Sequence, residues 1–467
     1  MSNQKKTYII LGILLPLLIA VALCIVFFSA PKDTAPKTPA KGITVLDSKG
    51  QTMALVKNNN NILETDYWAY LEVVLAEAGE TMAQQMGCTP QQALDAMLTD
   101  GYTLHTAFDS VAFEAMVQGM EEYKLEYGCA MTDLQGNLLA VYSSPTENFA
   151  TYATSPYSSF KPLSVYAPAL EKDVANWSKV YQDAPYKQIE NEDGQLQDWP
   201  VNDSKSYSYE SVAVCQSIKA SLNTVAVRCL AELGVTESMD FLKENFAIPL
   251  TEEFYVVEEY GEEEVIGNIA LGYLETGVTP VDMAGFYQIF ANGGSYVAPK
   301  TITQITDGSG ERVYVRKDEA KQVLSPATAD VMNKLLQGVV APGGTGAAAR
   351  CSNVQVAGKT GTGDDYSDNW FVGVTPGYSL AVWHGASPSN DAAKMFSGVM
   401  EALYDQQPKA NTQFITHKNL NQVIYCTHSG MAISGACTDI EIGYYPTKDL
   451  PVCDACQKNE TEVDLNA

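Results

Sequence analysis

Positive charge and histidine are scarce in this chain of 467 residues. Lysine and arginine together number 29, against 56 aspartates and glutamates, so the net charge is −27. Such an acidic chain is repelled by phosphate backbones, and we therefore expect no nucleic-acid partner. The four histidines form no paired-ligand pattern such as H-E-x-x-H, so we exclude a histidine-ligated metal hydrolase and expect no metal and no cofactor in the reaction.

Charge is absent altogether from residues 7–31. As a helix this run is roughly 37 Å long, which is enough to cross a bilayer. It is longer than the core of a signal peptide, and Phe28-Ser29-Ala30 is a poor cleavage site. We predict an uncleaved membrane anchor, with a signal peptide as the alternative. Lys5 and Lys6 favour a cytoplasmic N-terminus, so we expect a single-pass protein with all later residues outside the cytoplasm.

Ten cysteines are present, and Cys24 lies within the anchor. Four of the others cluster near the C-terminus, at positions 426, 437, 453 and 456. On an oxidising face of the membrane we expect these four to form disulfides. A zinc site is the alternative, because Cys453-x-x-Cys456 has the spacing of metal ligands.

The rest of the chain divides by composition and periodicity. A Pro-rich linker over 32–42 precedes a pedestal region over 43–126, where we predict a hairpin near 43–55 and helices near 66–86, from Pro90, and near 108–124. After residue 127, strands are expected at both ends with helices between them; these strands are 130–142 (a pair), 354–356, 370–374 and 378–383. The pattern predicts an α+β fold over 127–405, an antiparallel sheet flanked by helices, followed by a cysteine-containing tail over 406–467.

The chemistry is carried by Ser158-Ser-Phe-Lys161. A serine hydroxyl needs a base beside it to act as a nucleophile, and residues three apart share one face of a helix. A second Ser-x-x-Lys, Ser29 to Lys32, ends the hydrophobic run, where Pro31 opposes a helix. Ser158 is preferred because two further motifs follow it, Ser221-Leu-Asn223 and Lys359-Thr-Gly361.

The order Ser-x-x-Lys, Ser-x-Asn, Lys-Thr-Gly is a serine acyl-transferase signature. Ser367-Asp-Asn369 also matches the middle motif literally, but it comes after Lys359 instead of before it. We therefore choose Ser221-Leu-Asn223, which has a helical context.

Over most of residues 101–405 the chain resembles the transpeptidase module of penicillin-binding proteins. The stretches that carry the resemblance include Ser158-Ser-Phe-Lys-Pro162, Ser221-Leu-Asn-Thr-Val-Ala-Val-Arg228, Gly358-Lys-Thr-Gly-Thr362 and Asn369-Trp-Phe-Val-Gly-Val-Thr-Pro376. Other features resemble the bifunctional class A members, yet too few residues precede Gly101 for a glycosyltransferase domain. Tyr157 stands where the class A pattern usually has glycine.

The resemblance implies catalytic roles for five residues. Ser158 would attack a D-Ala-D-Ala carbonyl, and Lys161 would take its proton. Ser221 would relay a proton to the leaving amine, and Asn223 would orient Lys161 and the substrate. A base at neutral pH needs a lowered lysine pKa, to which Lys359 could contribute as a nearby cation.

Substrate binding is implied for the third motif. Lys359, Thr360 and Thr362 would hold the terminal carboxylate, and Gly361 would let the substrate lie close to the strand. The N–H groups of Ser158 and Thr362 would form the oxyanion hole.

The function implied is a D,D-transpeptidase anchored in a bacterial cell membrane, with its catalytic domain extracytoplasmic. It would cross-link peptidoglycan stem peptides and be acylated by β-lactams. A separate glycosyltransferase is an expected partner. The alternatives are a D,D-carboxypeptidase with the same site and a non-catalytic penicillin-binding scaffold or sensor in cell-wall assembly.

Overall fold

The computed structural model describes residues 41–458, except 58–60, 191–193, 249, 251–261, 387–390, 409 and 419. The predicted anchor over 7–31 and nearly all of the linker lie outside these residues. Within the part of the chain that is described, no helix is both long and apolar enough to span a membrane.

A five-stranded sheet forms the centre of the fold, in the order β14-β15-β16-β4-β5, with every neighbouring pair antiparallel. Its strands are β4 (Tyr127–Asp133), β5 (Leu138–Ser143), β14 (Ala357–Thr362), β15 (Asp368–Val374) and β16 (Tyr378–Gly385). Strand β14 therefore lies at an edge of this sheet.

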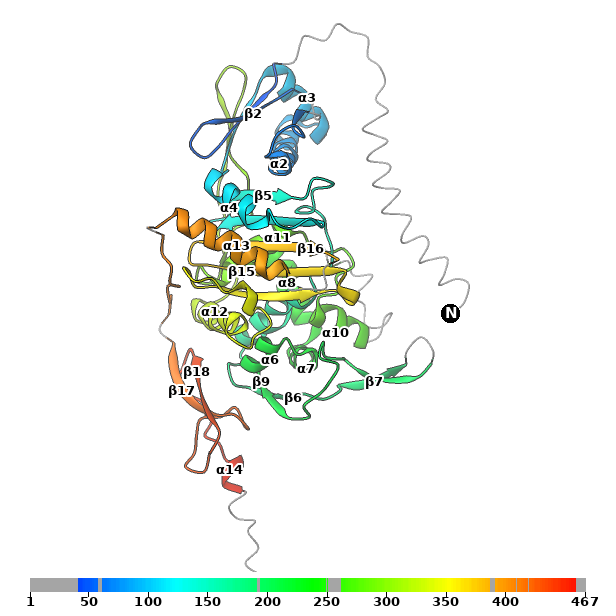
Figure 1. Ribbon diagram of the computed structural model, residues 1–467, viewed down its shortest axis with the longest axis vertical. Helices are drawn as coiled ribbons and strands as arrows, with labels where there is room; N and C mark the ends of the chain where they lie inside the picture. Colours follow the sequence, from blue (N-terminus) through cyan, green and yellow to red (C-terminus); the bar gives the residue numbers. More distant parts are fainter. Residues whose placement is uncertain are drawn as a thin grey trace, which may run out of the picture. The chain divides into compact units, whose positions relative to one another are not determined.

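Helices cover both faces of this sheet. Successive residues of a strand point to opposite faces, and β15 shows what each face meets. The ring of Phe371 packs against Phe396 of α13 (Asp391–Gln406), with the centroids 4.8 Å apart. On the other face, where Thr132 of β4 lies in register with Val374 through Ser379, the Thr132 hydroxyl donates to Ala284 O of α11 (Pro280–Tyr287) at 3.4 Å. The predicted antiparallel sheet with flanking helices is therefore confirmed, and Figure 1 shows α4 (Ser110–Met120) and α13 lying over one of its faces.

Helices are distributed along the whole of the described chain. Those of the first part are α2 (Trp68–Met86), α3 (Pro90–Asp100), α4 (Ser110–Met120), α5 (Ala167–Glu171), α6 (Val214–Ala220), α7 (Asn223–Leu233) and α8 (Val235–Phe246). The later ones are α10 (Glu262–Leu271), α11 (Pro280–Tyr287), α12 (Pro326–Val340), α13 (Asp391–Gln406) and α14 (Ala455–Lys458). Helices α4 and α13 cross closely at Gly119, where a Cβ would lie 2.5 Å from Val399 N.

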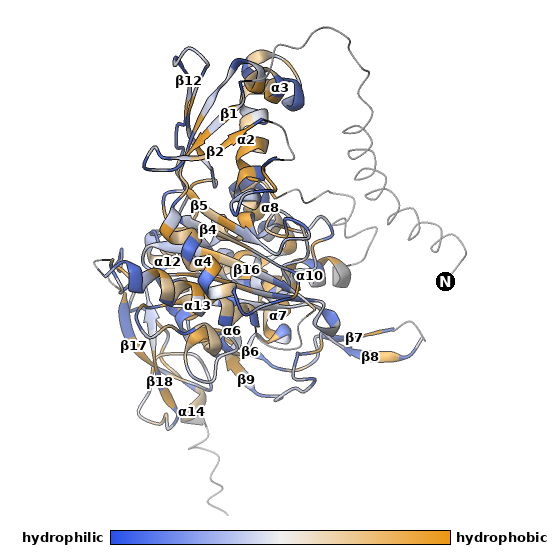
Figure 2. Cartoon of the chain, turned by 45° about the horizontal axis from the view of Figure 1, so that its top comes forward, coloured by the Kyte–Doolittle hydropathy of each residue, from blue (hydrophilic) through white to orange (hydrophobic). Residues whose placement is uncertain are grey.

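A second sheet has the order β12-β11-β3-β1-β2. Its strands are β1 (Ile43–Leu46), β2 (Thr52–Val56), β3 (Thr103–Thr106), β11 (Ile302–Thr306) and β12 (Arg312–Val315). The predicted hairpin and helices of the 43–126 region are present, and α3 begins with a capping box between Thr89 and Gln92. Figure 2 shows that α2, which packs in this part, is largely hydrophobic. Unexpectedly, two strands of this sheet, within 302–315, come from a part of the chain far from residues 43–126.

Two expected segments differ in the structure. The run at 354–356 is not a strand, because the N–H of Gln355 bonds to Thr412 O instead of to a neighbouring strand. The strand begins at Ala357 and contains Lys359-Thr-Gly361 itself. At 181–209 the polar sequence predicts a surface loop, but the structure has short strands there; these are β6 (Val180–Gln182), β7 (Lys187–Glu190) and β8 (Leu196–Trp199).

The remaining strands are short pairs outside the two sheets: β9 (Ser211–Ala213), which pairs with β6; β10 (Ser295–Tyr296) with β13 (Lys321–Gln322); and β17 (Asn421–Cys426) with β18 (Ile440–Tyr445). The tail thus contains the β17–β18 hairpin and α14. None of the nine cysteines that the structure describes is in a disulfide, so the expected disulfides of the tail are not observed.

Candidate active site

Ser158 lies in a 3₁₀ turn, η2 (Tyr157–Phe160), which continues into a π-helical turn, η3 (Pro162–Tyr166). In a 3₁₀ turn the residues i and i+3 are eclipsed, and the N–H of Lys161 donates to Ser158 O. Ser158 and Lys161 therefore follow one another along the same side of the turn. Ser158 is half-buried, whereas Lys161 is fully buried.

The turn is held in an unfavourable backbone conformation at Tyr157, whose φ is 49°. This left-handed region costs a non-glycine residue roughly 1–2 kcal/mol, which explains why a glycine would suit this position. The Tyr157 N–H donates to Gly272 O at 3.0 Å, and its ring meets that of Tyr273 edge-on at 5.3 Å. Neighbouring groups thus hold the strained residue directly before Ser158.

Lys161 reaches across to the Ser221-Leu-Asn223 motif. Its Nζ donates to Ser221 O at 2.9 Å and to Asn223 Oδ1 at 2.5 Å. No hydrogen bond recorded among the described residues joins Lys161 Nζ to Ser158 Oγ. The motif itself is the turn between α6 and α7, where Ser221 takes a left-handed conformation with φ 59°.

Lys359, on edge strand β14, also contacts Ser221. Its Nζ donates to Ser221 Oγ at 2.8 Å and to Thr360 O at 3.0 Å. Ser221 therefore accepts from both lysines, through its carbonyl from Lys161 and through its hydroxyl from Lys359. All three sequence motifs thus meet around one serine.

Burial controls the charge of both lysines. It lowers the pKa of Lys161 to about 8, and the carboxylate of Asp203 opposes part of this fall. Burial also lowers the pKa of Lys359, and the charge on Lys161 lowers it further. Protonation of both lysines at the same time is therefore unfavourable, because both are buried and their positive charges repel each other.

The other residues of the third motif have different surroundings. Thr360 Oγ1 donates to Thr345 Oγ1 at 3.0 Å and is nearly buried, whereas Thr362 is exposed. At Gly361 a Cβ would lie 2.4 Å from Pro156 O. This glycine is thus required for β14 to pack on the turn that carries Ser158; its expected contact with substrate stays a prediction.

The literal Ser367-Asp-Asn369 match lies at the start of β15 and is used structurally. Asp368 Oδ1 accepts from the indole of Trp383 at 2.8 Å and from Thr154 Oγ1 at 3.2 Å. Asp368 therefore ties β15 to β16 and to the segment before Ser158.

Comparison with known proteins agrees with this arrangement. Residues 128–399 match the model of the penicillin binding protein transpeptidase domain. The chain belongs to this family. The match begins within β4 and ends within α13, so it covers the central sheet and all three motifs.

The curated relatives are considerably longer proteins. Penicillin-binding protein 1A of Clostridium botulinum is 34% identical over 251 residues, which cover 53% of this chain and 29% of the relative. Penicillin-binding protein 4 of Bacillus subtilis is 30% identical over 302 residues, or 62% of this chain and 45% of the relative. The chain thus spans less than half the length of these members of the family.

A solved structure shares the fold. The D,D-transpeptidase domain of a peptidoglycan glycosyltransferase from Eggerthella lenta aligns with a TM-score of 0.62 at 20% identity, covering 79% of this chain and 99% of that one. The likeness extends over nearly the whole of that domain.

Sequence patterns did not reveal the residues that hold Asn223 in place. Buried Asp183 accepts from Asn202 Nδ2 at 2.8 Å and from Thr224 Oγ1 at 2.7 Å, and Asn202 Oδ1 accepts from the Asn223 N–H at 2.9 Å. Burial raises the pKa of Asp183, but hydrogen bonds from Ser208, Thr224 and Asn202 outweigh it and lower the pKa. This family member therefore uses a buried carboxylate to fix the start of α7.

Asp203, beside this network, was also missed. Its Oδ1 lies 3.4 Å from Asn223 Nδ2, and its charge acts on both lysines. No sequence motif identifies Asp203, because only the folding of the 183–210 segment brings it close to the lysines.

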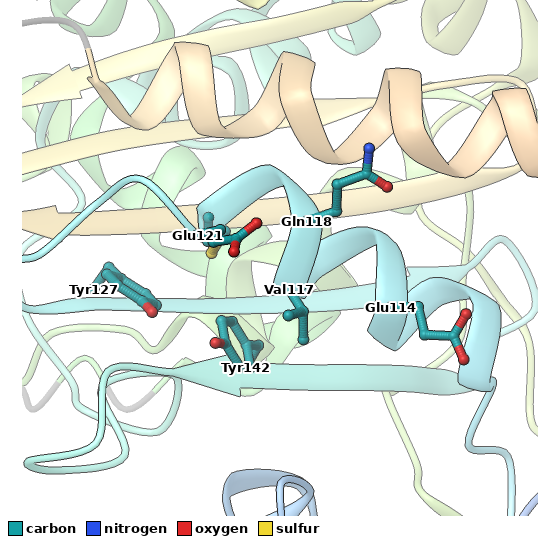
Figure 3. A pocket seen from close by; sticks show the side chains of 7 residues that line it. Glu114, Val117, Gln118, Glu121, Tyr127 and Tyr142 are labelled. Atoms are coloured by element: carbon teal, nitrogen blue, oxygen red, sulfur yellow. The ribbon is translucent and has the colours of Figure 1, made fainter.

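A hollow of about 420 Å³ lies elsewhere, between α4 and strands β4 and β5. Figure 3 shows Glu114 and Gln118 on α4, with Tyr127 and Tyr142 on the strands. Its lining contains two carboxylates but no lysine, serine or cysteine, and we assign no reaction to it.

Proposed function

We propose that the chain is a serine D,D-transpeptidase, anchored in a bacterial membrane by residues 7–31, which cross-links peptidoglycan stem peptides. The observation that carries the proposal is the meeting of Lys161 and Lys359 on Ser221, beside the turn that presents Ser158. A buried lysine with a lowered pKa supplies a base next to a candidate nucleophile.

Acylation would begin with neutral Lys161. Its Nζ turns from Asn223 Oδ1 to Ser158 Oγ and takes the proton, since catalytic hydrogen bonds often form fully only when substrate binds. Ser158 Oγ bonds to the carbonyl carbon of the penultimate D-Ala, and the C–N bond to the terminal D-Ala breaks. The Ser221 hydroxyl gives its proton to the leaving nitrogen and takes one from Lys359 Nζ, which donates to it at 2.8 Å. The acyl-enzyme would then hold Lys161 protonated, with the proton from Ser158, and Lys359 neutral.

The terminal carboxylate of the substrate would bind the third motif. Among the described residues, the hydrogen bonds of Lys359 Nζ go to Ser221 and Thr360, so an incoming carboxylate would supply a counter-charge in direct contact with it. That contact favours the charged form of Lys359, which in turn keeps Lys161 neutral. Thr360 and exposed Thr362 supply hydroxyl groups along the same strand.

The second half of the reaction decides the activity. An amine from a neighbouring stem peptide attacking the Ser158 ester gives a cross-link, whereas water gives a D,D-carboxypeptidase. A transpeptidase acts on strands that a glycosyltransferase has polymerised, and we propose a separate glycosyltransferase as its partner.

Labelling with a fluorescent penicillin tests the nucleophile, because a β-lactam acylates the same oxygen. We expect the full chain to be labelled and Ser158→Ala to lose the label. Ser309→Ala is the matched control, since Ser309 lies in the β11–β12 turn and, within the described part of the chain, its hydrogen bonds go to Asp307. Persistent labelling of Ser158→Ala would refute the nucleophile assignment.

Incubation with a stem pentapeptide and an acceptor amine tests the second half. A cross-linked product supports the transpeptidase, whereas release of D-Ala alone supports the carboxypeptidase. A chain that neither labels nor turns over substrate would be a scaffold.

A further inference from the structure

The four cysteines of the tail, separated by up to 30 positions in sequence, meet at one point. Their Sγ atoms all lie within 4.8 Å of one another. Cys426 ends β17, Cys437 lies in the loop before β18, Cys453 lies two residues before α14, and Cys456 lies in its first turn. Pairing of β17 with β18 places Cys426 near the loop that carries Cys437, and a bridge between Ala432 and Val452 places the later two cysteines beside them.

The distances suit a metal ion better than two disulfides. A disulfide holds its sulfurs about 2.05 Å apart, and Cys426 Sγ and Cys456 Sγ are 3.6 Å apart. A zinc ion bound tetrahedrally at about 2.3 Å places its sulfur ligands roughly 3.8 Å from one another. Two disulfides require only two short distances, whereas a tetrahedral ion requires all four sulfurs to be close together, as they are here.

The backbone around the cluster is organised for thiolate ligands. The N–H of Ser434 donates to Cys437 Sγ at 3.4 Å, and such contacts stabilise a metal-bound sulfur. The N–H of Gly430 closes a tight turn on Cys426 O at 2.8 Å, and that of Cys453 bonds to Ala432 O at 2.8 Å. Cys426 and Cys453 are buried, so two ligands are held in place before any ion arrives.

The nearby histidine does not compete for the site. His428 Nε2 bonds to Asp439 Oδ2 at 3.2 Å, and neither residue belongs to the sulfur cluster. The donor set is therefore four sulfurs.

We propose that Cys426, Cys437, Cys453 and Cys456 bind one Zn²⁺ in a structural site. Four thiolates fill the tetrahedral coordination of zinc and leave no position for water or substrate. The ion thus has no catalytic role, and the proposal is independent of the proposed function.

The site would stabilise a hairpin that contacts the helix leading to Ser221. Tyr425 OH lies 3.3 Å from Cys215 Sγ at the start of α6, and Tyr445 OH donates to Ser178 Oγ at 2.7 Å. Ser178 Oγ in turn donates to Gly430 O at 2.5 Å, inside the turn after Cys426. Zinc would therefore stabilise the support behind α6 as well as the tail itself.

Metal analysis of the full chain, purified in detergent without chelator or reductant, tests the site. We expect about one zinc per chain. The double variant Cys453→Ser with Cys456→Ser should lose it, whereas the control Cys88→Ser with Cys351→Ser, two half-buried cysteines outside the cluster, should retain it.

A measurement on the wild-type chain keeps the test valid should the variant fail to fold. Replacing zinc by Co²⁺ should give the sulfur-to-cobalt charge-transfer band and the intense visible bands of a tetrahedral thiolate site. Iron in place of zinc, or no metal together with two disulfides among these cysteines by mass spectrometry, would overturn the proposal.

Discussion

At the scale of single residues, the protonation state of Lys161 should limit the rate of acylation. Burial lowers its pKa to about 8, so about a tenth of Lys161 is neutral at pH 7. Only the neutral form can accept a proton from Ser158. We expect the second-order rate of penicillin acylation to rise about tenfold per pH unit below 8 and to level off above it, as measured by stopped-flow labelling.

The variant Lys161→Arg provides the comparison, because arginine stays protonated throughout this range. It should acylate at least about a hundredfold more slowly, the usual contribution of a general base, with no rise near pH 8. A wild-type rate that is flat between pH 6 and 8 would rule out Lys161 as the base.

Asp203 should shift the pH dependence of acylation through its charge, without taking part in the reaction itself. Its carboxylate raises the pKa of Lys161 against the effect of burial. In Asp203→Asn the pKa of Lys161 should therefore fall further, and the acidic limb of the acylation profile should move to lower pH. Asn at 203 keeps an oxygen that can accept from Asn223, so the geometry is preserved.

The control for this variant is Asp240→Asn, on the exposed side of α8, whose profile should match that of the wild type. An unchanged acidic limb in Asp203→Asn would contradict the electrostatic role of this carboxylate.

The residue scale also shows what a sequence can reveal about a site. The order of the three motifs favours Ser221 over Ser367, since order along the chain reflects the topology of the fold, whereas Ser29 was set aside because it ends the predicted anchor beside Pro31. Asp203 and Asp183 could not be predicted, because their roles depend on where the polar segment that contains them folds against the site. No local sequence pattern indicates the conformation of that segment.

At the scale of elements, the contact between β14 and the Ser158 turn depends on Gly361. A methyl group there would lie 2.4 Å from Pro156 O. We expect Gly361→Ala to lower the free energy of unfolding by about 1–3 kcal/mol, the usual cost of overpacking. It should also slow penicillin labelling, because the turn that carries Ser158 must move.

Gly338→Ala is a matched control in α12, where an added Cβ would meet nothing within 4 Å. Removing a helical glycine should raise stability by roughly 0.5–1 kcal/mol and leave labelling unchanged. Urea unfolding of both variants measures the difference. Equal stability of the two alanine variants would show that the close contact at Gly361 is absent.

Elements were predicted best where local chemistry defines their ends. The start of α3 follows from the Thr89-Pro90 pair, and the structure shows the complete capping box. The strand expected at 354–356 was placed too early. Val354 and Val356 are buried, which explains the apolar alternation, but the backbone there does not bond to a strand of the sheet. Periodicity reports burial, and it does not report which strand is the hydrogen-bonding partner.

At the scale of the whole molecule, the predicted division at residues 126 and 127 stays a prediction, but several contacts cross it. Strand β3 pairs with β11, which comes from the later part of the chain. Tyr70 OH donates to Leu138 O at 3.0 Å, and α4 packs on α13 around Gly119. A composition change along the chain could not reveal these long-range pairings.

These contacts predict that a fragment 127–467 does not fold as well as a fragment 42–467. Without the first region, β11 loses its partner β3 and exposes an unpaired edge, and α13 loses the cover of α4. We expect the shorter fragment to unfold at a lower temperature, to aggregate, and to label poorly with penicillin. The longer fragment, which keeps both sheets, should label like the full chain.

Thermal unfolding and labelling of the two fragments side by side make the comparison. Equal melting temperatures would show that residues 127–405 form an independent domain, as the sequence first indicated. A loss confined to the shorter fragment would instead mean that the turn carrying Ser158, the proposed nucleophile, depends on contacts from residues 42–126.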